Sequence, residues 1–497
     1  MNSKTRGERL RVDIKDSIGR PNFAARVGLD TPERAARLKD ILELIDREKI
    51  EVVRVALVDT HGQLRARPIE ARHFAQVVRN GAPFTTALFA MDSANMIFQN
   101  VFAEDGGFGR TAMGGAGDML ALADLETFKI LPWAHKTAIV LSDIYLTDGE
   151  RCPFDPRHVM QQACTRLSDA GYAYVAGIEV ECHIFKIVDP RLGLADCTQP
   201  ASPPAVEALR HGYQHLTESG VDALEPVIMP IRDALIRLGL PLRSVEIEWG
   251  PGQLEITLDP LGGLDAADAM ALLRTAVKQV CRRMGLIASF MTKPGLPNVF
   301  SSGWHLHQSL AHLDGSGNAF TSKDDLLSEV GRHFVGGLLQ HVRAGAAFSN
   351  PTINGYKRLN ANPLAPKRAV WSNDNKAAMC RLIGGPGDSA THIENRSGEP
   401  AANPYLFMAS QIFAGLDGLE KRTDPGSPRA DPYAQADREL MPASLMESID
   451  ALAQSAMFRK ALGDEFVNHF IAVKKSEIGR FLSHVTDWEQ KEYFEVF

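Results

Sequence analysis

Acidic and imidazole side chains recur inside segments that otherwise have the composition of β-strands. In GIEVECHIF, Glu179 and Glu181 alternate with apolar residues, and His305 and His307 alternate in the same way in WHLHQSL. Because side chains two positions apart project from the same face of a strand, each pair points to one side. Charged groups rarely lie among apolar neighbours unless they are paired or bind a metal ion. These positions therefore favour a metal site.

The same alternation occurs on both sides of a tight turn. In EIEWGPGQLEI, Glu248 and Glu255 flank a Gly-Pro-Gly turn, and a hairpin there can bring both carboxylates to one face, with Glu246 nearby. Glu394 and Arg396 alternate in THIENR. Several carboxylates with one imidazole suit Mg²⁺ or Mn²⁺ better than zinc, and their number indicates two ions. Any one of these glutamates could instead be solvated on an exposed strand, but that explanation is weak for the whole set.

Basic residues form a second chemically useful set. Lys357 and Arg358 lie in GYKRL, Arg381 in MCRLIG and Arg396 in HIENR, each among glycine, aromatic or apolar residues. The arginine fork grips carboxylates and phosphates with two hydrogen bonds. Surface solubility is the ordinary role of a single arginine, but metals and arginines together indicate phosphoryl transfer. The chain has no GxxxxGKS or GxxxxGKT motif, so it is not a P-loop enzyme.

The elements that must position these residues fall on both sides of GERCPFDP, whose Gly, Pro and Asp residues predict a domain junction. Before it, periodicity predicts one amphipathic helix and two strands, over residues 36–49, 51–59 and 137–146. The six glycines of residues 103–119 predict an irregular loop. Residues 1–35 are polar and unpatterned, which predicts a loosely ordered extension.

After the junction, helical and strand patterns alternate. The predicted helices cover 158–172 and 266–286, and the predicted strands cover 172–186, the two halves of 244–258, 287–293 and 304–310. From about residue 404 to residue 497 the pattern is mostly helical. The sequence therefore predicts an α+β protein with a small N-terminal domain and a large C-terminal domain.

Length and composition exclude several classes of protein. A chain of 497 residues is too long for one compact core, so two domains are expected. The net charge of −7 leaves no electrostatic footprint for nucleic acid, and no apolar run is long enough to span a membrane. The N-terminus lacks the apolar segment of a secretory signal. The six cysteines form no CxxC pair, so we expect reduced thiols in a cytoplasmic protein.

Five ordered motifs resemble those of the glutamine synthetase superfamily, in its bacterial type I-like form and in γ-glutamyl-amine ligases such as γ-glutamylanilide or γ-glutamylpolyamine synthetases. GIEVECHIF resembles GxExEFF, EIEWGPGQLEI resembles HHEVAPGQxEI, and SSGWHLHQSL resembles GSGMHxHQSL. NPTINGYKRL resembles NPTxNSYKRL, and HIENRSGEPAANPYL resembles RIExRxPDPAANPYL. The resemblance covers about residues 50–497, and five motifs in order are highly specific.

The resemblance implies a role for each matching residue. The implied metal ligands are, for one Mg²⁺ or Mn²⁺ ion, Glu181, Glu248 and Glu255, and for the other, Glu179, His305 and Glu394. The implied contacts to the ATP phosphates are His307, Ser309 and Arg381. The implied glutamate-binding residues are Arg358, Arg396 and Gly303, and the implied catalytic residues are Arg358, Arg381 and Lys376.

The resemblance also implies a reaction and an architecture. In such enzymes ATP phosphorylates the γ-carboxylate of glutamate, and an amine then displaces phosphate from the acyl phosphate. The implied architecture is an N-terminal extension with a first helix, a β-grasp domain and a glutamine synthetase catalytic domain, over residues 1–47, 48–150 and 151–497. Family members form double rings with sites between adjacent subunits, so we expect a homo-oligomer, a double-ring dodecamer.

Three departures from the family bear on the amine. Where ammonia-using members carry a PGYEAP flap, the chain has YKRLNANPLAP, which places Leu364 at the flap glutamate. Where they carry FDGSS, NGAPFTTALF places Thr85 at the aspartate, with Asp92 nearby as an alternative carboxylate. Their NR pair becomes Asn375-Lys376. Because an ammonium ion leaving water needs acceptor partners, losing two carboxylates favours an organic amine with an apolar body, alkyl or aromatic, such as aniline.

Thr85 and Leu364 are thus predicted to line the amine site. Four residues could add an apolar wall, although core packing is the ordinary role of such side chains: Phe84, Phe89, Met91 and Trp249. A di- or polyamine is the second candidate acceptor, and ordinary ammonia-using glutamine synthetase is a further alternative. A non-catalytic member of the family would have lost metal ligands, yet all six candidates are present.

Overall fold

The computed structural model describes residues 22–191, 193–361, 364–434, 437 and 439–497, and it confirms the mixed α and β class. Residues 1–21 of the predicted extension lie outside the described residues. Helix α2 (Phe23–Arg26) and helix α3 (Pro32–Arg47) follow, so helical structure begins before the predicted helix over 36–49. Helix α3 starts early because the Thr31 hydroxyl caps it by accepting the Arg34 N–H, and proline suits the first helical position.

Two compact units make up the chain. The first contains the residues up to Phe89, Gln99–His158 and Asp233–Leu240, and the second contains Ala90–Phe98, Val159–Arg232 and Pro241–Phe497. Each unit is therefore assembled from separate stretches of sequence. The limits 1–47, 48–150 and 151–497 describe continuous domains, and they stay a prediction. No helix among the described residues has both the length and the apolarity that crossing a membrane requires.

The first unit is built on a six-stranded mixed sheet of order β2-β1-β6-β4-β3, with β5 paired to β6. Strands β1 and β6 run parallel, and the other pairs are antiparallel. The strands are β1 (Val52–Val58), β2 (Leu64–Glu70), β3 (Ala82–Thr85), β4 (Asp118–Ala123), β5 (Lys129–Ile130) and β6 (Thr137–Leu146). Its other elements are α4 (Phe74–Asn80), η1 (Ala71–His73), η3 (Thr111–Ala116) and η4 (Leu125–Thr127), and η2 (Thr86–Ala90) follows β3.

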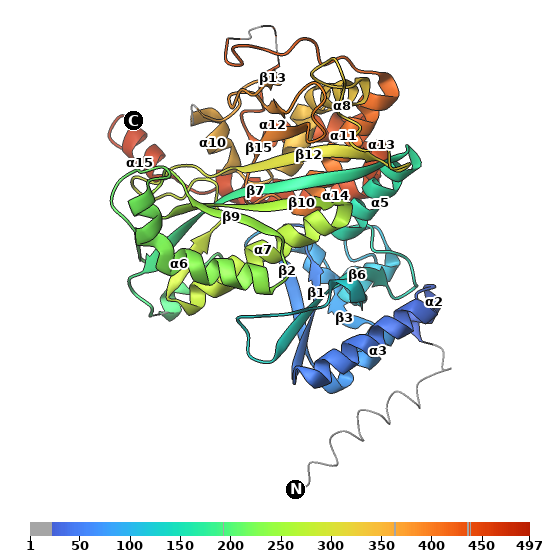
Figure 1. Cartoon of the computed structure of the whole chain (residues 1–497). Helices are drawn as coiled ribbons and strands as arrows, with labels where there is room; N and C mark the ends of the chain where they lie inside the picture. The colour runs from blue at the N-terminus through green and yellow to red at the C-terminus, as the bar shows by residue number, and fades with distance from the viewer. Residues whose placement is uncertain (1–21, 192, 362–363, 435–436, 438) are drawn as a thin grey trace. The chain divides into compact units, whose positions relative to one another are not determined.

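The second unit is built on a nine-stranded sheet of order β13-β14-β15-β12-β7-β10-β9, with β8 and β11 also paired to β7. Among the described strands of this sheet, only β13 and β14 pair in parallel. Figure 1 shows β12, β7 and β10 side by side. The strands are β7 (Tyr172–Ile187), β8 (Val206–Glu207), β9 (Leu242–Ile247), β10 (Gln253–Gly262), β11 (Leu286–Ser289), β12 (Trp304–His312), β13 (Trp371–Asn373), β14 (Cys380–Ile383) and β15 (His392–Gly398).

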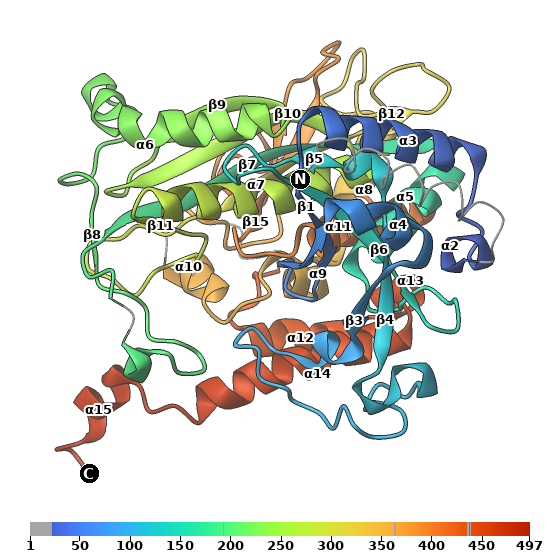
Figure 2. The ribbon, with the colours of Figure 1, turned by 90° about the horizontal axis from the view of Figure 1, so that it is seen from below.

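Helices cover one face of this sheet. Helix α7 packs against β7, β10 and β11, α9 packs against β15, and α11 packs against α7, α8 and α9. Helices α12 and α14 lie side by side (Figure 2). The remaining elements are α5 (Pro156–Asp169), α6 (Glu218–Arg237), α7 (Gly263–Arg283), η5 (Leu194–Asp196), α8 (Glu329–Gln340), α9 (Val342–Ser349), α10 (Gly355–Ala361), α11 (Pro404–Lys421), α12 (Leu445–Gln454), α13 (Ala456–Leu462), α14 (Asp464–Leu482) and α15 (Asp487–Tyr493).

The alternation of side chains in β7 determines which face of the sheet carries the charged groups. Ile178, Val180 and Cys182 are at most 2 % exposed beneath the helices. Because successive side chains of a strand point to opposite faces, Glu179 and Glu181 project from the other side of the sheet. Burial of the apolar side chains thus fixes the orientation of β7, and Glu179 and Glu181 are held on the opposite face of the sheet.

Candidate active site

Strand register brings the acidic and imidazole side chains into adjacent rows on that face. Glu255 of β10 lies opposite Glu181 of β7. On the other side of β7, His305 of β12 lies opposite Glu179. Directly opposite residues have their Cβ atoms about 5 Å apart, so their side chains interact. Three strands therefore contribute four polar side chains to one patch of surface.

The row continues across two more strands. His307 of β12 pairs with Glu394 of β15, and Glu394 pairs with Arg381 of β14. Gly177 of β7 lies opposite His307, and a Cβ at Gly177 would lie 3.2 Å from the His307 Cβ. Such a contact is tighter than most real Cβ contacts, so the glycine gives the imidazole the space it occupies.

Two groups of ligand atoms lie close enough to share a metal ion. Glu179, Glu255 and His305 each offer an atom within 4.8 Å of the others, and so do Glu179, His307 and Glu394. His305 Nδ1 lies 2.5 Å from one oxygen of Glu179, and His307 Nε2 lies 3.1 Å from the other. Glu179 therefore belongs to both groups. The grouping adds His307 to the possible ligands, and the division of the six predicted ligands between two ions stays a prediction.

Glu181 is held by two donors. The Gly303 N–H donates to Glu181 Oε2 at 3.0 Å, and the Gln253 amide donates to the same oxygen at 2.9 Å. Gln253 also reaches the Ser302 hydroxyl at 3.1 Å. A Cβ at Gly303 would lie 2.7 Å from Arg358 Nη2, so only glycine lets the backbone approach both the carboxylate and the guanidinium.

Glu248 directly follows β9 and faces the cluster from the hairpin turn. Its Oε2 accepts a hydrogen bond from the backbone N–H of Trp249 at 3.0 Å and lies 3.6 Å from His215 Nδ1. Burial raises the pKa of Glu248, although the Trp249 N–H and the nearby charges of His215 and Lys376 oppose the shift. Lys376 itself is exposed in the loop between β13 and β14.

Burial and mutual repulsion favour the neutral form of two carboxyl groups. Burial, followed by the charges of Glu179, Glu181 and Glu248, raises the pKa of Glu255 to about 10. Burial raises the pKa of Glu181 to about 8, although the Arg358 guanidinium opposes this shift. Such groups become anions when positive charge arrives beside them. The cluster therefore has the electrostatics of a divalent-cation site.

Neighbouring histidines have the opposite effect on Glu179, because they lower its pKa. Burial disfavours its carboxylate, but hydrogen bonds with His305 and His307 outweigh burial and lower its pKa. Burial also lowers the pKa of His305 to about 4, so its imidazole is neutral at pH 7. Because Nδ1 faces Glu179, Nδ1 carries the proton and the Nε2 lone pair is available as a ligand. The donor set, oxygens plus imidazole nitrogen, fits Mg²⁺ or Mn²⁺.

Two buried arginines lie beside this cluster. Arg358 donates to the carbonyls of Arg396 at 3.1 Å and of Gly398 at 3.4 Å. Arg396 pairs through Nη1 with Glu394, whereas its buried Nε has no hydrogen-bond partner among the described residues. A buried donor without a partner costs about 1–3 kcal/mol. The Arg396 Nε therefore indicates a place for an anionic ligand.

The predicted phosphate contacts extend the polar face toward the β13 edge of the sheet. Arg381 donates through Nη1 to Glu394 at 3.1 Å and through Nε to Asp374 at 3.0 Å. Ser309 shares the face of β12 that carries the two histidines, because it follows them in the same alternation. The structure thus places Arg381 and Ser309 beside the cluster, and their contact with ATP stays a prediction.

The predicted amine-site residues do not belong to the strands of the nine-stranded sheet. Thr85 ends β3 in the first unit, and its hydroxyl donates to the Ala116 carbonyl at 2.8 Å. Leu364 lies beyond α10 and is 49 % exposed. Asp92 is fully buried and accepts a hydrogen bond from Arg480 at 2.7 Å, so it serves an internal ion pair. The roles of Thr85 and Leu364 in binding the amine stay predictions.

The four residues named as a possible apolar wall differ in burial. Phe84 and Phe89 are 6 % and 0 % exposed, which agrees with core packing. Met91 is half-buried and forms an isolated bridge with Ile97. Trp249 is 45 % exposed, so core packing is the wrong interpretation for this residue.

Sequence reasoning missed three polar residues of the site. Gln253 precedes Glu255 by two positions on β10, and His392 precedes Glu394 by two on β15. His392 Nε2 lies 3.0 Å from Nδ1 of His307, and the alternation of strand residues could have identified both positions. His215 lies in a loop without periodicity, and no pattern in the sequence singles it out.

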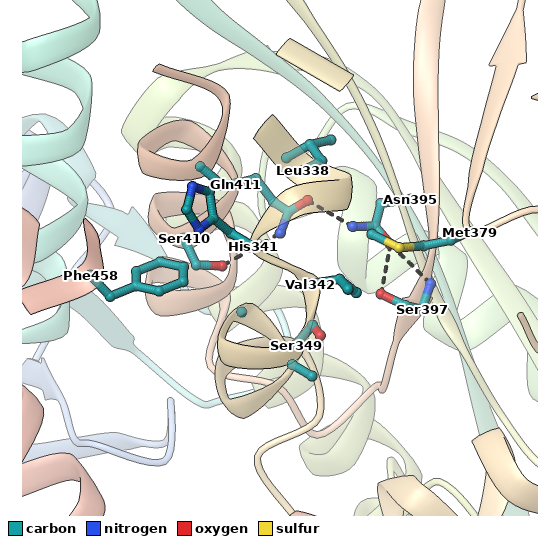
Figure 3. A pocket seen from close by; sticks show the side chains of 13 residues that line it. Leu338, His341, Val342, Ser349, Met379, Asn395, Ser397, Ser410, Gln411 and Phe458 are labelled. Atoms are coloured by element: carbon teal, nitrogen blue, oxygen red, sulfur yellow. Dashed lines mark hydrogen bonds between the residues drawn. The ribbon is translucent and has the colours of Figure 1, made fainter. Parts of the chain in front are cut away.

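The helix-covered face of β15 borders a small polar cavity (Figure 3). Asn395 and Ser397 alternate with the charged residues of β15 and line the cavity together with Gln411 of α11. Asn395 donates to Gln411 at 2.7 Å, and the Ser397 hydroxyl donates to Asn395 at 2.7 Å. These satisfied polar contacts hold the strand from behind and so fix the direction of its charged side chains.

The fold and this site define a member of the glutamine synthetase family. Residues 153–493 match the model of that family described as "Glutamine synthetase, catalytic domain", so the chain belongs to the family, and the resemblance predicted from the sequence is confirmed. The chain is therefore a carbon–nitrogen ligase of a family whose members use ATP and divalent metal ions.

Two relatives and one solved structure are similar to this chain over most of its length. The gamma-glutamylanilide synthase of an Acinetobacter species is 40 % identical over 496 residues, which cover 96 % of this chain and 99 % of that one. The glutamate–isopropylamine ligase of a Pseudomonas species is 31 % identical over 471 residues, covering 93 % and 99 %. The solved structure of a GmaS/ADP complex is 27 % identical with a TM-score of 0.76, and the match covers 91 % of this chain and 99 % of that one.

Proposed function

We propose that this chain joins the γ-carboxylate of glutamate to an organic amine at the expense of ATP, with an apolar alkyl or aromatic amine such as aniline as the preferred acceptor. The observation that carries the proposal is the convergence of an acidic cluster and two buried arginines on one face of the large sheet. The two ligase relatives described above are named for amines with apolar bodies, which supports the choice of acceptor.

The acidic cluster is suited to Mg²⁺ or Mn²⁺, with two or more ions in each site. The residues that would hold them are Glu179, Glu181, Glu248, Glu255, His305 and Glu394. When bound, these ions supply charge neutralisation at the phosphoryl group during its transfer. The raised pKa values of Glu181 and Glu255 support this assignment, because a cation relieves the repulsion that causes part of the shift.

The arginines orient the two substrates. The unsatisfied Nε of Arg396 and the buried Arg358 suit the carboxylates of glutamate, next to Gly303. Arg381 and Ser309 would meet the ATP phosphates. A γ-carboxylate oxygen then attacks the terminal phosphorus, and the bond to ADP breaks. The amine nitrogen attacks the acyl carbon, phosphate leaves, and the nitrogen loses a proton.

The choice of acceptor rests on positions where this sequence differs from ammonia-using glutamine synthetases. Leu364 and Thr85 replace carboxylates that would stabilise an ammonium ion, and Asp92 is occupied by Arg480. An apolar amine needs no such partner, and an arylamine is already neutral at pH 7. Ordinary glutamine synthetase and γ-glutamylpolyamine synthetase are the alternatives.

Steady-state kinetics with ammonia, putrescine, ethylamine and aniline test this proposal. We expect ADP release that requires both glutamate and an amine, with the highest kcat/KM for aniline or ethylamine. The highest kcat/KM for ammonia or putrescine would refute the choice of acceptor. The absence of amine-dependent ADP release with all four would refute the ligase reaction itself.

We further propose a cytoplasmic homo-oligomer, a double-ring dodecamer with sites between subunits. The end of the chain supports self-association, because it exposes large apolar side chains: Leu482, Val485, Trp488, Phe494 and Phe497. All six cysteines are free thiols, which supports a reducing compartment. Mass photometry of the full chain measures the oligomer, and a monomer at micromolar concentration would refute it.

A further inference from the structure

Four aromatic side chains form a stacked group, here called the aromatic platform: Tyr213, His215, Trp249 and Phe300. The Trp249 ring lies parallel to the His215 ring at 5.5 Å and 7°, and it stacks on Phe300 at 6.3 Å and 28°. Tyr213 meets Phe300 edge-on at 6.4 Å and 78°. Both geometries are favourable for aromatic pairs, so the rings support one another.

The aromatic platform is open to solvent. Trp249 and Tyr213 are each 45 % exposed, and Phe300 is half-buried. Contiguous exposed apolar surface of this kind marks binding sites more often than isolated exposed residues do. The rings are therefore not part of the hydrophobic core, and they present an aromatic face that a ligand can reach.

The aromatic platform is fixed directly to the acidic cluster. Trp249 follows Glu248 in the hairpin turn and donates its backbone N–H to Glu248 Oε2 at 3.0 Å, and His215 Nδ1 lies 3.6 Å from the same oxygen. Arg210 holds the turn by donating to the carbonyls of Glu248 and Gly250 at 2.5 and 3.3 Å. A ligand resting on the Trp249 ring therefore lies next to the Glu248 carboxylate.

The loop between β11 and β12, which carries Phe300, is anchored to the same site. The His183 Nε2–H donates to the Phe300 carbonyl at 2.8 Å. Three residues further along the chain, Gly303 donates to Glu181. The aromatic platform and the acidic cluster are thus held by one set of backbone contacts, which sets their spacing.

We propose that the aromatic platform selects an aromatic amine: the ring of the acceptor stacks on Trp249 and continues the stack with His215 and Phe300, and its amino N–H donates to Glu248. This inference rests on the proposed ligase function and deepens it by naming arylamines as the acceptor class. Trp249 acts as a specificity-determining residue, because a flat ring gains stacking there that a branched alkyl group does not.

An adenine ring is the other aromatic group that the reaction supplies, and the sheet order argues against it. Arg381, the predicted phosphate contact, lies on β14, whereas Glu248 and Trp249 follow β9 at the opposite end of the order β13-β14-β15-β12-β7-β10-β9. Five strand pairings separate β14 from β9 in this order. In the strand order, Glu248 and Arg381 thus lie on opposite sides of β7 and β12.

The test compares Trp249→Ala, Trp249→Phe and a control, Leu313→Ala, in the full-length protein. Leu313 is 54 % exposed just beyond the end of β12, outside the site. For each we would measure kcat/KM for aniline and for isopropylamine, and KM for ATP. We expect Trp249→Ala to lower kcat/KM for aniline about tenfold, the scale of a lost aromatic pair. The value for isopropylamine and the ATP KM stay unchanged, and Trp249→Phe keeps most of the aniline activity.

Three outcomes would overturn the inference: an equal loss for both amines, a rise in the ATP KM alone, or a wild-type preference for isopropylamine over aniline. The first would make Trp249 a support for Glu248, and the second would make the aromatic platform a nucleobase site. A wild-type protein that releases no ADP with any amine would refute the proposed ligase function instead. Quenching of tryptophan fluorescence by aniline, lost in Trp249→Phe, provides a measurement that needs no turnover.

Discussion

Replacing Glu255 by glutamine removes one charge from the acidic cluster while keeping the shape of the side chain. In the metal-free protein the folded pKa of Glu255, about 10, lies above its ordinary value of 4.5. Between these pH values the folded protein binds more protons than the unfolded chain, so the free energy of unfolding falls as pH rises. The fall is about 1.4 kcal/mol per pH unit, which reaches about 4 kcal/mol at pH 7.5.

The Glu255→Gln variant avoids this loss. A buried amide still pays some desolvation, so we expect the metal-free variant to recover about half of it, roughly 2 kcal/mol at pH 7.5. For a chain of this length, about 1 kcal/mol corresponds to about 1 °C in Tm. The variant should therefore melt about 2 °C above wild type in EDTA at pH 7.5, and the difference should shrink toward pH 5.

Metal should reverse the order of the two melting temperatures, so that wild type melts above the variant. An ion present at 100 times its Kd stabilises the folded protein by about 2.7 kcal/mol, so Mn²⁺ should raise the wild-type Tm by about 3 °C. The variant lacks one carboxylate ligand and should gain much less. Differential scanning calorimetry in EDTA and in Mn²⁺, at pH 5 and pH 7.5, measures all four values. A variant that melts below wild type in EDTA, or that keeps the full Mn²⁺ shift, would refute the assignment of Glu255 to a cation site.

Three further predictions concern the substrates. Gly303→Ala places a Cβ 2.7 Å from Arg358 Nη2 and 3.1 Å from His305 Nε2, so KM for glutamate should rise at least about tenfold while circular dichroism stays unchanged. Arg396→Lys removes the fork whose Nε lacks a partner, and KM for glutamate should rise about tenfold with little change in the ATP KM; an unchanged glutamate KM would contradict its role. Leu364→Glu should raise kcat/KM for ammonia relative to aniline by roughly fivefold, and no change would weaken the flap alignment.

The strands that carry the site could be predicted because their signal is local. Alternation in β7 and β12 identified Glu179, Glu181, His305 and His307 as residues of one face, and the turn in EIEWGPGQLEI identified a hairpin. The common face of five strands depends on pairing between segments more than 70 residues apart, such as Glu255 with Glu181. Register of this kind is set by packing across the whole sheet, and the sequence supplied it only through the family resemblance.

Other features carry no local signal or a misleading one. Helix α6 contains Pro226 and Pro230, which interrupt a helical pattern, so no element was predicted there. Asp92 was considered as a ligand for the amine, yet Arg480, almost 400 positions later, occupies it. His215 reaches Glu248 from a loop without periodicity. For Asp92 and His215, a partner distant in sequence decides the role of the residue.

The proposed metal ligands and the aromatic platform lie in different secondary structure. Five of the six proposed metal ligands sit within strands that pair on both sides, where a change disturbs neighbours in the sheet. The rings of Tyr213, His215, Trp249 and Phe300 sit in loops and turns, which tolerate substitution. Substitutions of these four aromatic residues can therefore change the amine that is accepted, while the residues of the ligase reaction stay the same. A library randomised at these four positions should keep folding and yield enzymes for amines of other sizes.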